Sequence, residues 1–424
     1  REKYYFRMFG KGVIKITFKE YSLTNYSNSD ISISNVIVLH LYILICKNML
    51  VNVSDFWFGY NNIFNNLITV FFAIIYLRLL FVSDLTRKIK SGVIAMVLFV
   101  ILFVLITYGI DSNRFTSNVF PYTYVKTQLR TFAAYCLPLF IVVSTLTSID
   151  CLLERLYKFT FLPFVISTIS FLFSLQPHEN GVYMSYGNAV MFLSVLLLFK
   201  YAHTKNLFDL IQFALTCLYI LISGSRGPLV SIFIAVFFVM IIFSKRNPLL
   251  LVLLVLMTFL IVLFYNQILD FIISVLERMN VRSRTILMYL EGNITSDSDR
   301  SLYHEKLLEQ LNQNPIIGLG AFGGEAVVGL AHSLYLDILA NFGYLFGSLF
   351  IGYIIIKDSF LIIKYKGTGI SELLLILSII IFPRGFFDES FWNSKELWMI
   401  MGLFIQIGNA PQTRFAYLSK KQTY

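Results

Sequence analysis

Apolar stretches long enough to cross a membrane alternate with short polar connections along most of the chain. Windows of roughly 17 to 25 apolar residues, the length of a helix that spans about 30 Å of hydrocarbon, recur along the sequence. This pattern predicts twelve transmembrane helices, at 33–51, 62–82, 91–110, 131–149, 159–176, 186–199, 207–223, 227–243, 248–265, 332–356, 369–387 and 393–409. The first contains His40 and Lys47, and the last begins near Lys395 and Glu396, so these two also fit helices that lie along the membrane surface.

The composition agrees with this pattern. Hydrophobic residues make up 57% of the 424 positions and charged residues 14%, whereas soluble domains carry about 25% charged residues. We therefore predict an all-α integral membrane protein, a polytopic bundle of about twelve transmembrane helices, rather than several soluble domains. The four cysteines are scattered without metal-ligand spacing, so no metal site is predicted.

Lys and Arg lie mainly in the N-terminal tail and in alternate short connections, for example Arg87, Lys88 and Lys90. Because such residues mark cytoplasmic connections, we expect both termini in the cytoplasm. The formal net charge of +10 then faces the anionic lipids of the inner leaflet, and no nucleic-acid partner is indicated. The predicted division is a cytoplasmic tail (1–32), nine helices (33–265), an outer loop (266–331), three helices (332–409) and a second cytoplasmic tail (410–424).

The outer loop at 266–331 is far longer than the other connections, which indicates that it has a function of its own. Its first part, "ILDFIISVLERMNVRSRTILMYL", predicts an amphipathic helix near the membrane surface. A second helix is predicted in "SDSDRSLYHEKLLEQLNQNP", where Ser298 or Asp299 is the N-cap and the NP dipeptide marks the end. Arg300 then lies in the first turn, one turn before His304.

Arginine predominates among the basic residues of this loop, although acidic residues outnumber the basic ones. A planar guanidinium binds two phosphate oxygens at once, so individually placed arginines explain an anion site better than a diffuse positive field. For Arg282 and Arg284, contact with a phosphate and pairing with nearby acids fit equally well. The later "GLGAFG" segment fits a dinucleotide-binding pattern, but it lacks the strand that this motif requires, so tight packing of glycines is the better interpretation.

Two short outer connections contain further arginines. In "LISGSRGPLV", Arg226 runs against the positive-inside rule. Either it reaches an outer-leaflet phosphate, or it forms an anion pocket with the N–H groups that begin the next helix, which we favour. In "PRGFFDESFWNSKE", Arg384 and Asp388 lie at the same outer level, either as substrate-binding residues or as a salt bridge.

His332 stands where the chain enters the tenth predicted helix, in "HSLYLDILANFGYLFG". Its imidazole titrates near neutral pH and can accept a proton from a hydroxyl, which Lys and Arg ordinarily cannot. Asp337, Asn341, Tyr344 and Ser348 continue a polar stripe that would be costly against lipid. The stripe favours a His332 that opens onto a polar cavity in the bundle over one that merely begins the helix.

Arg226 in "SGSRGP", Arg300 before "NPIIGLG" and His332 in "HSLYLDILANFGYLFG" resemble, in order and spacing, the motifs of the bacterial O-antigen polymerase and O-antigen ligase superfamily. The resemblance covers roughly residues 207–356. It implies an integral-membrane glycosyltransferase of the GT-C type that uses an undecaprenyl diphosphate-linked glycan donor, a glycan acceptor, and neither metal nor other cofactor. It further implies a location in the bacterial inner membrane, a periplasmic outer face, and a chain-length regulator and a flippase as partners.

The same resemblance implies roles for single residues. Arg226 and Arg300 would bind the diphosphate of the donor, and His332 would be the general base that acts on the acceptor hydroxyl. Asp388 matches, more loosely, an acidic residue of the last outer connection. The remaining substrate-binding candidates rest on their chemistry and position: Arg282, Arg284, Arg384 and His304.

Three functions fit these features. A polymerase joins the growing chain to the next lipid-linked repeat unit, and the Phe-, Ile-, Tyr- and Asn-rich composition favours it. A ligase, which transfers the finished glycan to lipid A-core, is the alternative within the superfamily. A flippase or other transporter of lipid-linked oligosaccharides would also have about twelve helices, but transporters place charges in mid-helix, whereas here the Arg and His residues gather at the outer face.

Overall fold

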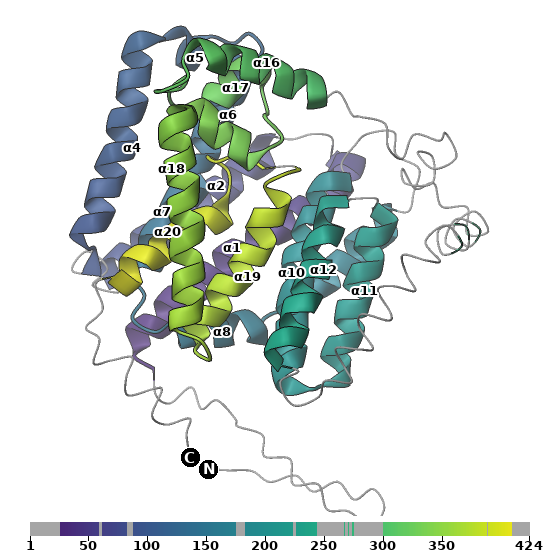
Figure 1. The fold of residues 1–424 in the computed structure, drawn as a ribbon. Coiled ribbons are helices and arrows are strands. Elements are labelled where there is room, and N and C mark those ends of the chain that lie inside the picture. Colours follow the sequence, from purple (N-terminus) through teal and green to yellow (C-terminus); the bar gives the residue numbers. More distant parts are fainter. Residues whose placement is uncertain are drawn as a thin grey trace, which may run out of the picture.

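The computed structural model describes residues 26–58, 62–82, 88–174, 183–223, 226–243, 300–387 and 389–408, together with the single positions 267, 270 and 274. Throughout this part the regular secondary structure is helical, as predicted (Figure 1). The first half contains α1 (Asn28–Phe58), α2 (Asn62–Val82), α4 (Ser91–Ile110), α5 (Asn113–Thr116), α6 (Tyr122–Thr131), the π-helical segment Phe132–Cys136, α7 (Leu137–Ser144), α8 (Ile149–Lys158) and α9 (Phe161–Ser174). The second half contains α10 (Tyr183–Thr204), α11 (Leu207–Ser223), α12 (Arg226–Phe243), α16 (Arg300–Gln313), α17 (Gly323–Val328), α18 (Leu334–Lys364), α19 (Gly369–Arg384) and α20 (Lys395–Gly408).

Four helical segments are long and apolar enough to cross a membrane: Asn28–Lys47, Ser91–Ile110, Tyr122–Ser144 and Leu334–Lys364. Shorter apolar helices accompany them, so the chain is a multi-pass membrane protein. Twelve transmembrane helices remain a prediction, and the ninth of them, at 248–265, lies outside the described residues.

Predicted and observed helix bounds agree where a long apolar run stands between polar breaks. The predictions at 62–82, 91–110 and 207–223 coincide with α2, α4 and α11. The prediction at 131–149 is wrong in its start and its end, because α6 extends the helix toward the N-terminus through the polar stretch "YTYVKTQLRT". The π-helical segment joins α6 to α7, and this helix ends at Ser144. A new helix, α8, follows, and the side chain of Ser148 caps it by accepting a hydrogen bond from the N–H of Cys151.

The helices that carry the predicted outer residues gather at one end of the bundle. There α5, α6, α16 and α17 lie together, while α8 lies at the opposite end (Figure 1). Arg155 and Lys158 belong to α8, and Arg300 begins α16. Residues predicted to face opposite sides of the membrane therefore lie at opposite ends of the bundle.

The core runs through α10, α19 and α20, whose apolar side chains are almost all buried. In contrast, α4 stands at the edge of the bundle (Figure 1) and buries only Val93, Val100 and Thr107 along its length. Nine of its other side chains are large, apolar and exposed on the protein: Ile94, Leu98, Phe99, Ile101, Leu102, Leu105, Ile106, Tyr108 and Ile110. This distribution is typical of a helix that faces lipid, where apolar side chains need no protein partner.

A loop from the end where α5, α6, α16 and α17 gather inserts into α18 and kinks it. The N–H of Leu319 donates to the carbonyl of Ala340 (2.7 Å), and the N–H of Tyr344 donates to the carbonyl of Pro315 (2.7 Å). In a regular helix the N–H of Tyr344 would donate to the carbonyl of Ala340 instead. The loop thus replaces one helical hydrogen bond with two of its own, and every group involved keeps a partner.

Two glycines make this insertion possible. Gly343 has a φ of 79° inside α18, and Gly318 has a φ of 80° in the loop. A Cβ on Gly318 would lie 2.3 Å from the backbone nitrogen of Gly343, too close for any side chain. The "GLGAFG" segment therefore serves close backbone packing, as the sequence indicated.

Candidate functional site

His332 lies at the turn from α17 into α18. Its φ of 50° is in the left-handed region, and its side chain is half-buried. Ser333, the next residue, caps α18 by accepting a hydrogen bond from the N–H of Leu336 (3.4 Å). A non-glycine residue in this conformation is uncommon and is found disproportionately at functional sites.

The start of α16 packs against this turn. Nε2 of His304 lies 3.0 Å from the carbonyl oxygen of Ala331, the residue before His332. The ring centroids of Tyr303 and His332 are 6.4 Å apart. Arg300 is the first residue of α16, one turn before His304, as the sequence predicted. Two predicted site residues, His304 and His332, therefore belong to one contact between α16 and the entry to α18, and Arg300 begins the same helix.

The turn after α19 lies between these elements and α12. The N–H of Leu334 donates to the carbonyl of Gly385 (2.8 Å), and Nη1 of Arg300 donates to the carbonyl of Phe387 (2.8 Å). On the α12 side, a Cβ built on Gly227 would lie 3.4 Å from the Cβ of Phe387, which is ordinary contact distance. The starts of α12, α16 and α18 thus meet around residues 384–387.

Arg226 is the first residue of α12, one position before Gly227. Its backbone therefore lies at the same turn as Arg300 and His332, although the three residues are far apart in the sequence. A helix N-terminus also presents backbone N–H groups and a positive dipole end, both of which favour anions.

Residues 211–351 match the family model described as O-antigen ligase. This segment is therefore similar to the O-antigen ligase family over about a third of the chain. It includes Arg226, Arg300 and His332, which lie at the starts of the three helices that meet around residues 384–387. No curated protein and no solved structure matches the chain.

Arg384, a substrate-binding candidate from its chemistry and position, is buried among acidic side chains. It is 4% exposed and forms ion pairs with Glu389 and with Glu396, the latter at 3.3 Å between Nη2 and Oε2. Nζ of Lys395 also lies 3.1 Å from Oε1 of Glu396. This burial favours a structural role for Arg384 over direct contact with substrate.

Three other candidates, Arg282, Arg284 and Asp388, lie outside the described residues. For metal binding, the described residues contain no group of three or more His, Cys, Asp or Glu side chains placed to hold an ion.

The predicted polar stripe of α18 divides in the structure. Asp337 and Asn341 are fully buried, Tyr344 donates its hydroxyl hydrogen bond to Asn312 of α16 (2.9 Å), and Ser348 is exposed. The prediction that all four continue one polar stripe is therefore wrong. The kink at Gly343 turns the helix between Asn341 and Tyr344, so helical periodicity does not hold across it.

Asp337 and Asn341 instead form a closed hydrogen-bond network. Oδ2 of Asp337 accepts from the hydroxyl of Ser390 (3.0 Å) and from the N–H of Phe391 (2.7 Å). Nδ2 of Asn341 donates to Oδ1 of Asp337 (3.1 Å), and its Oδ1 accepts from Nε1 of Trp392 (2.9 Å). This network ties α18 to the segment between α19 and α20.

Glu325 of α17 joins this network, and the sequence reasoning missed it. The hydroxyl oxygen of Ser390 lies within hydrogen-bond distance of Oε1 of Glu325 as well as of Oδ2 of Asp337. Burial raises the pKa of the Glu325 carboxyl well above its usual range, and the Asp337 carboxylate raises it further. The only sequence signal was an acid next to the paired glycines of "GGEAVV", in a stretch that had no predicted helix.

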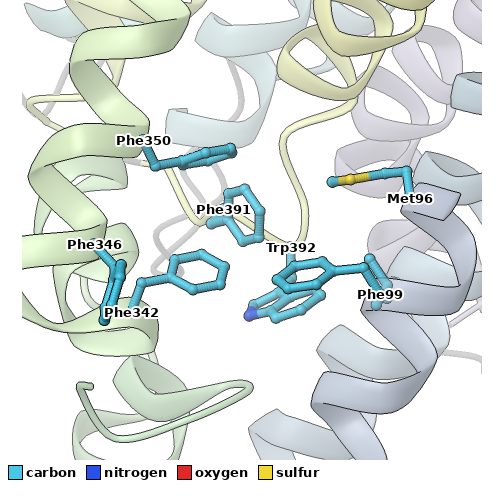
Figure 2. A pocket seen from close by; sticks show the side chains of 8 residues that line it. Met96, Phe99, Phe342, Phe346, Phe350, Phe391 and Trp392 are labelled. Atoms are coloured by element: carbon cyan, nitrogen blue, oxygen red, sulfur yellow. The ribbon is translucent and has the colours of Figure 1, made fainter. Parts of the chain in front are cut away.

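An apolar cavity lies between α18 and α4 (Figure 2). Its volume is ≈ 190 Å³, and Phe342, Phe346, Phe391 and Trp392 are among the side chains around it. Figure 2 shows Phe99 and Met96 of α4 closing it from the side opposite Phe342 and Phe346. With so little polar lining, this cavity is unsuited to a diphosphate or a sugar.

Proposed function

We propose that the chain is an O-antigen polymerase, a glycosyltransferase that joins undecaprenyl diphosphate-linked repeat units at the periplasmic face of the inner membrane. The observation that carries the proposal is the meeting of the starts of α12, α16 and α18 around residues 384–387. This meeting brings Arg226, Arg300 and His332 to one turn, and all three lie in the segment that matches the superfamily.

In this proposal the donor diphosphate binds at the starts of α12 and α16. Arg300 has its guanidinium oriented by the carbonyl of Phe387, and Arg226 begins a helix whose first N–H groups favour an anion. Two guanidinium groups stabilise the negative charge that develops on the departing diphosphate. No metal is required for this step, because the arginines supply the positive charge.

His332 is the proposed general base. Its imidazole takes the proton of the acceptor hydroxyl while that oxygen forms a bond to the anomeric carbon and the bond from this carbon to the diphosphate breaks. Attack on the face opposite the leaving group inverts the configuration at the anomeric carbon. The contacts of His304 and Tyr303 hold the His332 turn in place.

A ligase is the second candidate, because the matching family model is described as O-antigen ligase. A ligase would transfer the glycan to lipid A-core and would use the same residues in the same chemistry. The choice of polymerase rests on the Phe-, Ile-, Tyr- and Asn-rich composition.

Deletion and complementation in the host, followed by electrophoresis of lipopolysaccharide, separate the two functions. Loss of a polymerase leaves core with a single repeat unit, whereas loss of a ligase leaves bare core and accumulated lipid-linked polymer. We expect His332→Ala and Arg300→Ala to reproduce the deletion with normal amounts of protein in the membrane. The control Arg130→Ala, at an exposed position of α6, should restore the full ladder of chain lengths. A full ladder from His332→Ala would contradict the proposed mechanism.

A further inference from the structure

A second cavity, polar and larger than the first, opens at the outer end of the molecule, where α5, α6, α16 and α17 gather (Figure 1). Its volume is ≈ 390 Å³, which is within the range of about 300 to 1,000 Å³ typical of small-ligand sites. Its hydrogen-bonding side chains come from three parts of the chain and comprise Asp111, Arg114, Tyr122, Lys306, Glu309 and Gln310.

One wall of this cavity is fixed by Arg114. Its Nη1 donates to the carbonyls of Leu319 (2.8 Å) and Ala321 (3.0 Å), and its Nε donates to Asp111 (3.4 Å). These bonds tie the connection between α4 and α6 to the loop that inserts into α18. One wall of the cavity is therefore backbone fixed by hydrogen bonds, and the cavity does not depend on exposed surface side chains alone.

The charges in the cavity determine which ligand fits it. Asp111 and Glu309 balance Arg114 and Lys306, so a phosphate or diphosphate would meet two carboxylates there. Gln310 and Tyr122 add neutral groups that both donate and accept hydrogen bonds. A ligand with many hydroxyls and no charge satisfies such a mixed lining, because a hydroxyl also donates and accepts.

We propose that this cavity binds sugar residues of the acceptor glycan, away from the hydroxyl that reacts. This inference rests on the proposed function and adds a binding site to it. Val327 forms part of the cavity wall and precedes His332 by five residues, so the two positions are at most about 18 Å apart. Sugar contacts at that distance would help to hold the reacting hydroxyl near the base.

The test measures binding of a defined probe to the full-length protein in nanodiscs. The probe is the oligosaccharide of one repeat unit, freed from lipid, and its dissociation constant is measured by calorimetry. We expect the double variant Glu309→Gln with Gln310→Ala to weaken binding by about tenfold, the effect of losing one or two hydrogen bonds. A matched control exists on the same helix: Glu305→Gln with Gln313→Ala changes the same residue types at exposed positions outside the cavity lining.

Two further measurements separate this inference from the proposed reaction. His332→Ala should bind the oligosaccharide like the unmodified protein, even where it forms no polymer. Inorganic diphosphate, used as a second probe, should bind the cavity double variant and the unmodified protein equally. Unchanged oligosaccharide binding by the cavity double variant would overturn the inference, as would equal weakening in the control, and neither result would affect the role of His332.

Discussion

Nε2 of His304 lies 3.0 Å from the carbonyl oxygen of Ala331, the residue before His332. Because a carbonyl oxygen only accepts, His304 must carry a proton on Nε2 to make this hydrogen bond. The bond connects α16 to the turn in which His332 adopts its left-handed conformation. We therefore propose that His304 acts on the proposed base through the backbone, as a positioning residue rather than a catalytic one.

We expect His304→Ala to lower the rate of polymer formation by about five- to tenfold, because loss of one hydrogen bond of about 1 kcal/mol loosens the His332 turn. His304→Gln should recover most of the rate, since its amide N–H can donate to the Ala331 carbonyl. Polymer formation by purified protein on lipid-linked repeat units measures both variants. If the Gln and Ala variants are equally slow, the hydrogen bond does not position His332.

A substitution of Arg384 measures how much the buried ion pairs at the end of α19 contribute to stability. Arg384→Gln leaves the carboxylates of Glu389 and Glu396 without this partner in a buried site, which should destabilise the protein by about 3 to 5 kcal/mol. The midpoint of thermal unfolding in detergent should therefore fall. The double variant Arg384→Gln with Glu396→Gln should recover part of this loss. A midpoint unchanged by Arg384→Gln would show that the ion pairs contribute little.

The raised pKa of Glu325 leads us to expect that the stability of the protein depends on pH. Its pKa is raised in the folded protein by burial and by Asp337. The folded protein therefore keeps this proton to a higher pH than the unfolded chain does. Its contribution is fully present below the unfolded pKa of about 4.5 and falls by about 1.4 kcal/mol per pH unit as the pH rises toward the folded pKa. Glu325→Gln should remove this decline.

Thermal unfolding between pH 5 and pH 8 measures the effect. The unmodified protein should lose more stability over this range than Glu325→Gln does. Glu305→Gln, at an exposed position of α16, is the control and should follow the unmodified protein. Parallel curves for the Glu325→Gln and unmodified proteins would contradict the assignment of a raised pKa.

A substitution of Gly343 tests whether the loop inserts tightly into α18. A Cβ at this position would lie 2.1 Å from the carbonyl oxygen of Ile316, and the φ of 79° disfavours any side chain. Gly343→Ala should therefore destabilise the protein by more than about 2 kcal/mol. Gly352→Ala on the same helix meets no atom within 4 Å and should preserve stability. Similar amounts of both variants in the membrane, with similar unfolding midpoints, would exclude a tight insertion.

Helix bounds were predictable where the signal is local. In α2, α4 and α11 a continuous apolar run ends at polar residues, and the predicted and observed bounds coincide. The short helix α17 was not predicted, because "GGEAVV" has too few residues to show a helical period and begins with two glycines. The polar α6 was missed for a related reason, since its helix is supported by its continuation into α7 rather than by its own composition.

The sequence indicated which residue types the candidate site uses, but not which side chains they contact. Arg300 and His332 stood out because their side chains suit phosphate binding and proton transfer. The pairing of Arg384 with Glu389 and Glu396 depends on how the turn after α19 folds back, and the joining of Glu325 to Asp337 depends on Ser390, which is more than fifty residues away in the sequence. No local pattern contains such contacts.

The sequence alone determined that this chain enters a membrane as helices, because burying backbone groups in lipid requires helical hydrogen bonds and long apolar runs supply the side chains. It also determined which side chains can bind a phosphate or accept a proton. Only the tertiary structure decided that the starts of α12, α16 and α18 meet at residues 384–387, and that the polar stripe of α18 divides at Gly343. These two features arise from packing between distant segments, and helical periodicity along one segment carries no information about its neighbours.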